Sequence, residues 1–497
     1  MAWPAYNTCM AFDERHVFTR SQLEQILSKC IGKTLQEVDT QHVLNGKRNK
    51  GYAGAIIEQS VLGYPADSDR RPDLLVDGTP VELKTTGLVT SKKSKANGDS
   101  GYKAKEPVSV TAVQLDNICD EDFEHSGFWE KARHLLFVYY LYAHKTNSPA
   151  DYGDFPLLGY QFVDFIGEDK ELLKHDWEIV RDFIRQINAE HPEDPETQYP
   201  RISSELNRQR LSVIDTSPKW PNKPRFRLKA AFVTAIYNKY AGITFDDLPD
   251  DIRSLGELDH ECHRITDLYG GKTVEELFRI FGIDNRPAKS DGEAVTVRMF
   301  GGTAKKMGKV EIFAKFGVHG KSLVLTKKGG RTEDMKLFPV DFDELQDPSV
   351  GFEESSFYTY FSEAQLLCSV FEEPSFEAPF AENVFLGFKR FTFSDDFINT
   401  EVRAVWERMR ELVFNHELRI VPKRHKDGTP IINKTGVPSE APNWPKSAEH
   451  TVFVRGSGND SRPQFKTVVV NGLHMYRQDI WIKGTYLAEQ LNMLPFL

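Results

Sequence analysis

Long apolar runs, paired cysteines and nucleotide-binding glycine loops are all missing from this 497-residue sequence. Its five cysteines are scattered and form no C-x-x-C pair, which predicts free thiols in a reducing cytoplasm and no zinc site. No stretch approaches the ~20 apolar residues that span a bilayer, and the first residues lack the basic start and apolar core of a signal peptide. Neither a Walker loop nor a G-x-G-x-x-G is present, so we expect no ATP, no dinucleotide and no membrane partner.

An excess of positive charge is also missing, although the cations are unevenly placed. The chain carries 63 Lys and Arg against 73 Asp and Glu, a net charge of -10, which taken alone argues against nucleic-acid binding. One basic run interleaves Trp220 and Phe226 with its cations, a composition suited to a surface that follows a phosphate backbone. Each basic run is also compatible with an ordinary solvated loop. The runs lie at residues 46–51, 92–105, 219–229 and 422–426.

What is present is a short hairpin that carries charge. The stretch RPDLLVDGTPVELKTTG, residues 71–87, has an Asp-Gly pair between two β-forming runs, the composition of a two-residue hairpin loop. With that loop, Asp73 faces Glu82 on the opposite strand, with Cβ atoms roughly 4.5–5.5 Å apart. Lys84 lies on the same face by the period of two, while the apolar side chains between them point into a core.

Two of the hairpin's charged groups are carboxylates, which repel each other at this distance unless a cation lies between them. Hard divalent cations such as Mg²⁺ are held by one or two carboxylates together with substrate phosphates. The spacing Asp73-x8-Glu82-x-Lys84 therefore indicates a metal site with a neighbouring lysine. For the hairpin alone, a solvated ion pair on a sheet face stays open as the alternative.

Helical and strand patterns surround the hairpin. Residues 21–39 read as a helix that Gly32 interrupts, after which Thr34 and Glu37 have the spacing of a capping box. A second helical stretch covers residues 51–63, directly before the hairpin. Beyond the hairpin, VSVTAVQL and HLLFVYYLYA read as strands and residues 172–190 as an amphipathic helix.

A weak internal repeat divides the chain. IGKTLQEV at residues 31–38 returns as GGKTVEEL at residues 270–277, and an acidic, turn-rich segment lies between the halves. In the second copy, Lys321 takes the place of Lys84 and His319 that of Glu82, and no acid replaces Asp73. The second copy is thus expected to keep the shape and to have lost the metal site.

The order of these segments resembles a known family. NKGYAGAIIEQSVLG, PDLLVDGTPVELKTTG, VSVTAV and SGFWEKARHLLFVYY follow one another as in the mismatch-repair endonuclease MutH, of the PD-(D/E)xK nucleases. They resemble still more closely the two-domain type II restriction endonucleases that cut at GATC, and HGKSLVLTKKG, HTVFVRG and DIWIKGTYLAEQL extend the likeness. The resemblance implies a mixed α/β fold with two MutH-like domains, each a central mixed sheet flanked by helices. We expect a catalytic domain at 1–250 and a degenerate DNA-binding, allosteric domain at 265–497.

The resemblance also implies roles for particular residues. Asp73, Glu82 and, from the preceding helix, Glu58 would bind the metal, and Lys84 and Lys131 would be catalytic lysines. Glu58 is equally compatible with the polar edge of an amphipathic helix, and Lys131 with an ordinary lysine at a strand edge. The implied DNA contacts are Lys50, Arg208 and Arg455.

Two of these DNA contacts depart from the family pattern. Arg455 is followed by Gly456, where a proline is expected. The glycine-rich reading loop of the GATC enzymes is replaced by HPEDPETQYPRISSELNRQRLS, in which Arg208 and its polar neighbours can read bases in another pattern. GATC is therefore the default expectation for the site, and a different site stays open.

The implied activity is Mg²⁺-dependent cleavage of double-stranded DNA that leaves 5′-phosphates, with Mn²⁺ as a possible substitute. Such an enzyme would act in the bacterial cytoplasm in phage defence, beside a cognate DNA methyltransferase, and would self-associate on DNA. Two alternatives remain: a mismatch-repair-type nicking endonuclease, and a DNA-binding regulator that does not cut. A nickase needs only one MutH-like domain, and a regulator has no need of clustered carboxylates beside a polyanion.

Overall fold

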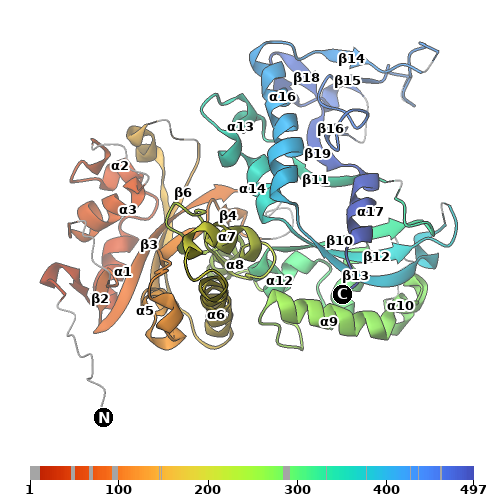
Figure 1. Ribbon diagram of the computed structural model, residues 1–497. Coiled ribbons are helices and arrows are strands. Elements are labelled where there is room, and N and C mark those ends of the chain that lie inside the picture. Colours follow the sequence, from red (N-terminus) through yellow and green to blue (C-terminus); the bar gives the residue numbers. More distant parts are fainter. Residues whose placement is uncertain are drawn as a thin grey trace. The chain divides into compact units, whose positions relative to one another are not determined.

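The computed structural model describes residues 12–45, 51–65, 71–91, 99–144, 146, 148–283, 291–331, 333–376, 378–425, 427–434, 436–458 and 462–497. By its contacts the chain divides into two compact units. The first contains residues up to 258 together with residues 309–317, and the second contains residues 259–308 and 318–497 (Figure 1). The described residues include no helix that is long and apolar enough to cross a membrane.

The first unit is built on a mixed sheet in the order β1-β2-β3-β6-β7, with β4 paired to β3. The β1–β2 and β3–β6 pairs are parallel, whereas β2–β3, β3–β4 and β6–β7 are antiparallel. Parallel neighbours need a crossover connection, which the short helix before β6 supplies between β3 and β6. The strands are β1 (Val17–Phe18), β2 (Leu74–Val76), β3 (Thr79–Thr90), β4 (Tyr102–Ala104), β6 (His134–Leu141) and β7 (Leu157–Asp164).

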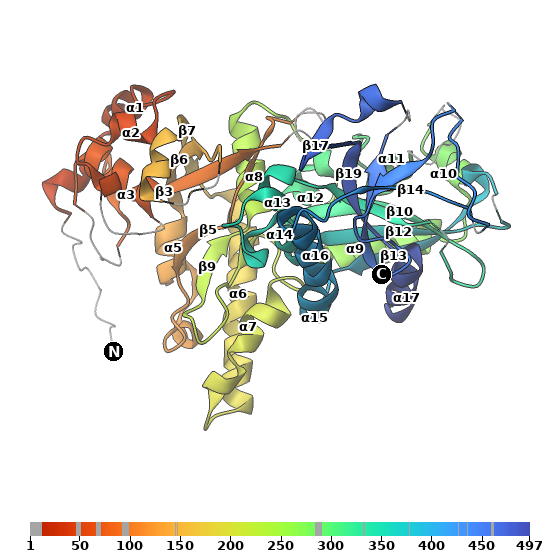
Figure 2. The same ribbon diagram turned by 90° about the horizontal axis from the view of Figure 1, so that it is seen from above.

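Helices cover both faces of this sheet (Figure 2). The side chains of Leu83 and Leu136 share a buried core with α1 and α3 on one face. On the other face, the ring of Tyr139 packs edge-on against Tyr237 of α8, with centroids 4.9 Å apart. The helices of this unit are α1 (Arg20–Ser28), α2 (Leu35–Val38), α3 (Tyr52–Ile56), α5 (Gly127–Ala132), α6 (Gly167–Glu190), α7 (Pro200–Leu206), α8 (Ala230–Tyr240) and α12 (Glu311–Phe316).

A second, three-stranded sheet of the first unit has the order β5-β9-β8, with β5 (Val108–Ala112), β9 (Arg225–Leu228) and β8 (Ile214–Asp215). The helix α5 packs on it, since the rings of Phe128 and Phe226 lie 4.9 Å apart. The sheet therefore lies beside the helix that leads into β6.

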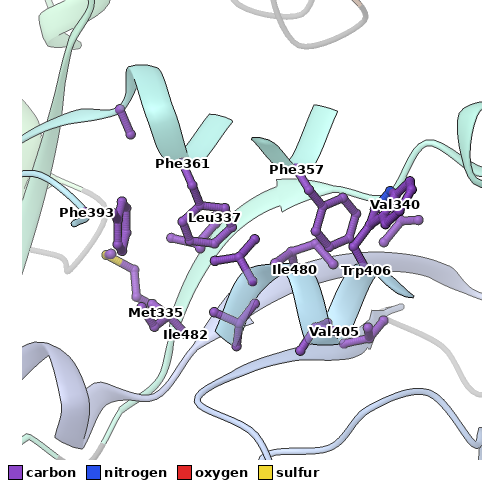
Figure 3. Close-up of a cluster of buried hydrophobic side chains, with 14 of the residues drawn as sticks. Met335, Leu337, Val340, Phe357, Phe361, Phe393, Val405, Trp406, Ile480 and Ile482 are labelled. Carbon is purple, nitrogen blue, oxygen red and sulfur yellow. The ribbon is translucent and has the colours of Figure 1, made fainter. Parts of the chain in front are cut away.

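The second unit repeats the mixed sheet in smaller form, in the order β10-β12-β13, with β10 and β12 parallel and β12 and β13 antiparallel. A further sheet has the order β11-β19-β16, and its side chains form a large core with α14 and α16 (Figure 3). The strands are β10 (Val318–Leu325), β11 (Met335–Pro339), β12 (Gln365–Glu372), β13 (Val384–Phe391), β14 (Ile420–Pro422), β15 (Glu440–Pro442), β16 (Val452–Ser457), β17 (Val468–Val470), β18 (Leu473–Met475) and β19 (Arg477–Ile482). The helices are α10 (Val274–Ile280), α11 (Gly292–Met299), α13 (Phe342–Gln346), α14 (Ser356–Glu363), α15 (Asp395–Phe397), α16 (Arg403–Phe414) and α17 (Gly484–Met493), while α9 (Leu255–Tyr269) crosses the boundary.

The repeated sequence adopts the same local structure in each unit. Thr34 and Thr273 both close a capping box, with Glu37 and Glu276, as the sequence predicts for the first copy. The glycine two residues earlier has φ of +82° at Gly32 and +80° at Gly271, and its N–H bonds to the carbonyl of Leu157 in one unit and of Phe385 in the other, at 2.8 Å in each. The match extends to β5–β9 and β11–β19, which carry a bulge at the same place in the ladder.

Candidate active site

The hairpin predicted from residues 71–87 is present. Leu74 pairs with Val81 and Val76 with Thr79, so facing residues have the predicted register. Asp77 and Gly78 have φ of +47° and +82°, as a type I′ turn requires, and Gly at the second position adopts this conformation without strain. The apolar side chains of β3 that point away from the charged face, Val81 and Leu83, are buried in the core as predicted.

The sequence predicts that Asp73 faces Glu82 in the hairpin ladder. The structure differs, because β2 begins only at Leu74. Along an antiparallel pair, hydrogen-bonded residues alternate, and a continued hairpin would join the N–H of Leu83 to the carbonyl of Pro72. Here the Asp73 carboxylate accepts that N–H instead, at 2.8 Å. The ladder between β2 and β3 therefore stops before it reaches Asp73. The side chain of Asp73 turns toward the beginning of the charged face of β3.

Glu82 is the most deeply buried charge of the site, with 2% of its surface exposed. Two lysines compensate it: Lys84 Nζ lies 2.7 Å from Oε1, and Lys131 Nζ lies 3.2 Å from Oε1 and 3.0 Å from Oε2. Lys131 comes from the last turn of α5, whose N-terminus is capped by the buried Ser126 hydroxyl accepting the N–H of Trp129. The structure therefore brings together four of the residues that the sequence singles out, from two strands and a helix.

The electrostatics of the site separate its two acids. Burial and, next, the charge of Glu82 raise the pKa of Asp73 to about 6, while Lys84, the Leu83 N–H and Lys131 oppose the rise. Both lysines bond directly to Glu82 and only influence Asp73 at longer range. The site without a cation thus holds an excess of negative charge on the Asp73 side, which is the side that a divalent cation would relieve.

His16 is a residue of the site that the sequence analysis missed. It is buried in front of β1, and its Nδ1 lies 2.7 Å from the backbone carbonyl of Asp73. Since a carbonyl oxygen only accepts, this nitrogen carries the proton in that contact. At the other end of β2, Asp77 donates its N–H to the carbonyl of Phe18 at 3.0 Å, so His16 and β1 together hold both ends of β2. His16 ends a three-residue helical turn, and β1 after it has only two residues. Elements this short leave no recognisable pattern in a sequence.

Glu58 lies on a helical extension of α3, the π-helical segment Ile57–Leu62, where the sequence predicts a helix. This segment shares its core with the Leu83 face of β3, opposite to the face of Glu82 and Lys84. Among the described residues, no group of three or more His, Cys, Asp or Glu side chains is arranged to hold a metal. The role of Glu58 as a third metal-binding carboxylate therefore stays a prediction.

The donors at the start of β3 nevertheless fit a hard divalent cation. Asp73 and Glu82 provide carboxylate oxygens on one face, and Mg²⁺ is commonly bound by one or two carboxylates, with waters and substrate phosphates completing its shell. Cysteine and histidine, the ligands of softer metals, do not take part in such a group in the described part of the chain.

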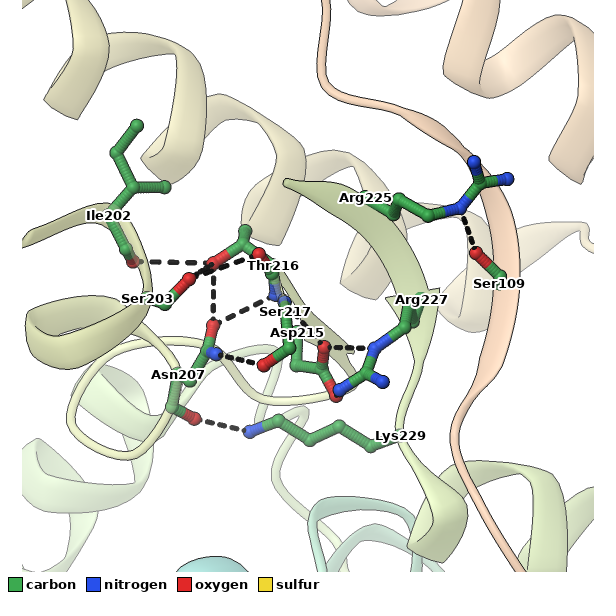
Figure 4. Close-up of polar contacts among 10 residues, drawn as sticks. All are labelled: Ser109, Ile202, Ser203, Asn207, Asp215, Thr216, Ser217, Arg225, Arg227 and Lys229. Atoms are coloured by element: carbon green, nitrogen blue, oxygen red, sulfur yellow. Dashed lines mark hydrogen bonds and ion pairs between the residues drawn. The ribbon is translucent and has the colours of Figure 1, made fainter. Parts of the chain in front are cut away.

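Of the predicted DNA contacts, Arg208 is half-buried in the turn after α7, and Lys50 lies outside the described residues. The turn is firmly held (Figure 4): the Asn207 side chain bonds the N–H and hydroxyl of Thr216 and the hydroxyl of Ser217, at 2.8 to 3.2 Å. Lys229 Nζ donates to the carbonyls of Asn207, at 2.9 Å, and Leu211, at 2.5 Å.

Beneath the same turn, a fully buried carboxylate orders the backbone. Asp176 of α6 accepts the N–H groups of Ser212, Val213 and Ile214 at 2.7 to 3.0 Å. A surface turn with this number of internal bonds displays its side chains in a fixed arrangement, which direct reading of base edges needs.

In the second unit Arg455 lies on β16, exposed over the rings of Phe453 and Trp481, and its guanidinium is 2.6 Å from Asp334. The residues at the position of the active site differ as the sequence predicts. His319 pairs with Leu366, the second residue after the cap of α14, just as Glu82 pairs with Leu135 after α5. Lys321 then takes the register position of Lys84.

The site lies in a segment of the first unit that matches a known family. Residues 62–176, which include Asp73, Glu82, Lys84 and Lys131, match the family model described as DNA mismatch repair enzyme MutH. The chain is 25% identical over 521 aligned residues to the type II restriction enzyme Sau3AI of Staphylococcus aureus, covering 96% of this chain and 99% of that protein. It is 27% identical over 238 residues to the DNA mismatch repair protein MutH of Shewanella woodyi, covering 44% of this chain and 93% of that protein. The predicted relationship to MutH-like nucleases and the predicted mixed α/β fold class are confirmed, and the predicted enzyme class agrees with both relatives.

Proposed function

We propose that this protein is a type II restriction endonuclease that hydrolyses phosphodiester bonds in both strands of DNA with Mg²⁺ as cofactor. The observation that carries the proposal is the convergence of Asp73, Glu82, Lys84 and Lys131 at the start of β3. Similarity over nearly the whole chain to a restriction enzyme supports it, as does the match of the site segment to the MutH family.

Each residue has a chemical task in this proposal. Asp73 and Glu82 would hold the cation, which lowers the pKa of a bound water and neutralises the scissile phosphate when present. Lys84 and Lys131 would then turn from Glu82 toward the phosphate, where one orients the attacking water and the other offsets the charge that develops on the phosphoryl oxygens. The backbone carbonyl of Leu83 is a further candidate ligand, and Glu58 would hold a metal-bound water. Departure of the 3′ oxygen leaves a 5′-phosphate.

Sequence selection would come from elsewhere in the chain. Arg208 and its neighbours in the turn after α7 would read base edges, and Lys50 would contact the DNA backbone. Arg455 would be the DNA contact of the second unit. GATC is the site by resemblance to the restriction enzyme, and the altered reading turn is compatible with a related short site. The domains proposed at 1–250 and 265–497 would form the catalytic half and an allosteric DNA-binding half without a metal set.

The test is digestion of unmethylated and methylated plasmid DNA by purified protein with Mg²⁺, beside Asp73→Ala, followed by sequencing of the ends. Discrete double-strand cuts that the variant loses support a restriction endonuclease, and the ends give the site. Cuts in one strand only would point to the nickase, and tight binding without any cut would point to a regulator. A cutting rate that is strictly first order in protein would contradict self-association on DNA.

A further inference from the structure

The second unit carries a β-arm, described at residues 420–425, 427–434 and 436–442, that reaches away from its helices and sheets (Figure 1). Its base is the antiparallel pair of β14 (Ile420–Pro422) and β15 (Glu440–Pro442). Beyond the base a third segment joins the ladder, because Lys423 accepts the N–H of Ile431, and Ile431 accepts that of Ser439. The arm is therefore a hydrogen-bonded ribbon and not a solvated loop, so its side chains have defined directions.

The arm is strongly basic in an acidic protein. Residues 420–439 contain three lysines and one arginine against a single acid, Asp427. That acid is occupied within its own turn, where it accepts the N–H of Thr429 at 2.9 Å and its hydroxyl at 2.6 Å. At the base of the arm, Glu440 is bonded to Lys466. Neither carboxylate is left to compensate the arm's cations.

Two further cations lie at the base of the arm and add to its excess of positive charge. Arg419 precedes β14, and Lys446 follows β15 closely enough for Lys423 to act on it. Burial, together with the nearby charge of Lys423, lowers the pKa of Lys446 to about 8. Within the described part of the chain, no carboxylate forms an ion pair with any of these cations: Arg419, Lys423, Arg424, Lys434 and Lys446.

We propose that this arm binds the phosphate backbone of duplex DNA, an inference that rests on the proposed function and names a contact surface for it. Successive side chains of an extended segment point to opposite faces, which places Lys423 and Arg424 on the two sides of the ribbon. A narrow ribbon with cations on both sides suits a groove of the duplex, whose two walls are lines of phosphates, and the major groove admits a β-ribbon. Contacts of this kind give affinity and position without choosing a sequence.

The experiment is a measurement of duplex binding by fluorescence anisotropy in EDTA, so that nothing is cut, over a series of salt concentrations. The full-length chain is compared with a triple variant, Lys423→Gln, Arg424→Gln and Lys434→Gln. Since each phosphate contact contributes about 0.9 to the slope of log affinity against log salt, the triple variant should lower that slope by about 2.7. The double variant Lys423→Arg and Lys434→Arg, which keeps both charges, should keep the parent slope.

A matched control removes three exposed lysines elsewhere in the same unit: Lys305→Gln, Lys327→Gln and Lys328→Gln. This control should leave the slope nearly unchanged, and melting curves should show all variants folded. An unchanged slope in the arm variant, with plasmid cutting intact, overturns the arm as a DNA contact while the proposed function stands. A parent chain that neither binds nor cuts DNA overturns both. A slope lowered equally by arm and control variants also overturns the arm, because the loss would then reflect net charge alone.

Discussion

Lys131 Nζ lies 3.0 Å from a carboxylate oxygen of Glu82, although 49 residues separate the two in the chain. The second lysine on the same carboxylate, Lys84, is only two residues away. Glu82 thus balances two cations while Asp73 is left with one backbone N–H and a raised pKa. We therefore expect the two acids of the site to have opposite effects on the free energy of unfolding of the metal-free protein.

Glu82→Gln should destabilise the metal-free protein. The substitution leaves the ammonium groups of Lys84 and Lys131, each less than one-fifth exposed, without their shared counter-charge. Removing one partner of a buried ion pair costs about 3 kcal/mol, which urea denaturation in EDTA would detect. Lys131→Met is the matched control, because Lys84 still pairs with Glu82, and its loss should be clearly smaller. A Glu82→Gln variant as stable as the parent would contradict this view of the site.

Asp73→Asn should stabilise the metal-free protein at neutral pH. The carboxyl pKa is raised to about 6 in the folded chain, so the folded state binds more protons than the unfolded state between about pH 4 and 6. Stability therefore falls as pH rises through this window, by about 3 kcal/mol for a shift of this size. The gain from Asp73→Asn should be present at pH 7 and absent at pH 4, and a gain independent of pH would count against the assignment.

The same pKa predicts the pH dependence of cleavage. Asp73 must be ionised to hold a cation, so the rate at limiting Mg²⁺ should rise as pH increases through about 6. Because cation and proton compete for one carboxylate, more Mg²⁺ should move the rise to lower pH. Rates measured over pH at two Mg²⁺ concentrations test this, and coincident profiles would exclude Asp73 as the titrating ligand.

His16→Ala should raise the Mg²⁺ concentration needed for half-maximal cutting and change the rate at saturating Mg²⁺ much less. The ring holds the backbone of Asp73 and touches none of the reacting atoms, so it acts by positioning. His16→Gln, which keeps an N–H donor, should recover part of the affinity for Mg²⁺. The exposed His125→Ala provides the control. Equal effects of His16→Ala on the saturated rate and on Mg²⁺ affinity would indicate a general loss of structure instead.

Local chemistry explains which parts of this site the sequence reveals. The Asp-Gly turn sets the hairpin register, and the period of two then separates Glu82 and Lys84 from the buried Leu83, so these features follow from adjacent residues. The position of Lys131 beside Glu82 depends on the parallel crossover between β3 and β6, which no residue spacing reveals. Its predicted role therefore rested on the family resemblance alone. Glu58 was predicted on a helix correctly, but the face of the sheet on which that helix packs is a tertiary property.

The repeat and the two compact units also differ in how far local sequence determines them. The repeated Gly-Lys-Thr segments make identical backbone bonds because a capping box and a left-handed glycine are encoded locally. The segment 309–317 lies in the second half of the sequence and nevertheless belongs to the first unit, where Lys315 pairs with Asp169 and Glu311 at 2.6 Å. The assignment of residues 309–317 to the first unit depends on packing between residues far apart in the chain, which the sequence pattern does not reveal.

Arg208→Ala should lower cutting at the preferred site by roughly 10- to 100-fold and affect binding to unrelated DNA far less, as expected for a residue that reads a base. Arg201→Ala is the control, because Arg201 is held by Glu205 at 2.6 Å on the preceding helix. Cleavage rates on duplexes with every single-base change in the site provide the measurement. A uniform loss on all duplexes would assign Arg208 to the backbone.

The most direct test of the central claim, that Asp73 and Glu82 with two lysines form a divalent-metal nuclease site, is a Mg²⁺ titration of plasmid cutting. Asp73→Asn is compared with Asp77→Asn, a change in the same hairpin that creates Asn-Gly, an equally suitable turn. The account predicts Mg²⁺-dependent double-strand cuts by the parent and by Asp77→Asn, and none by Asp73→Asn. Cutting that survives in Asp73→Asn, or that needs no divalent cation, would contradict it.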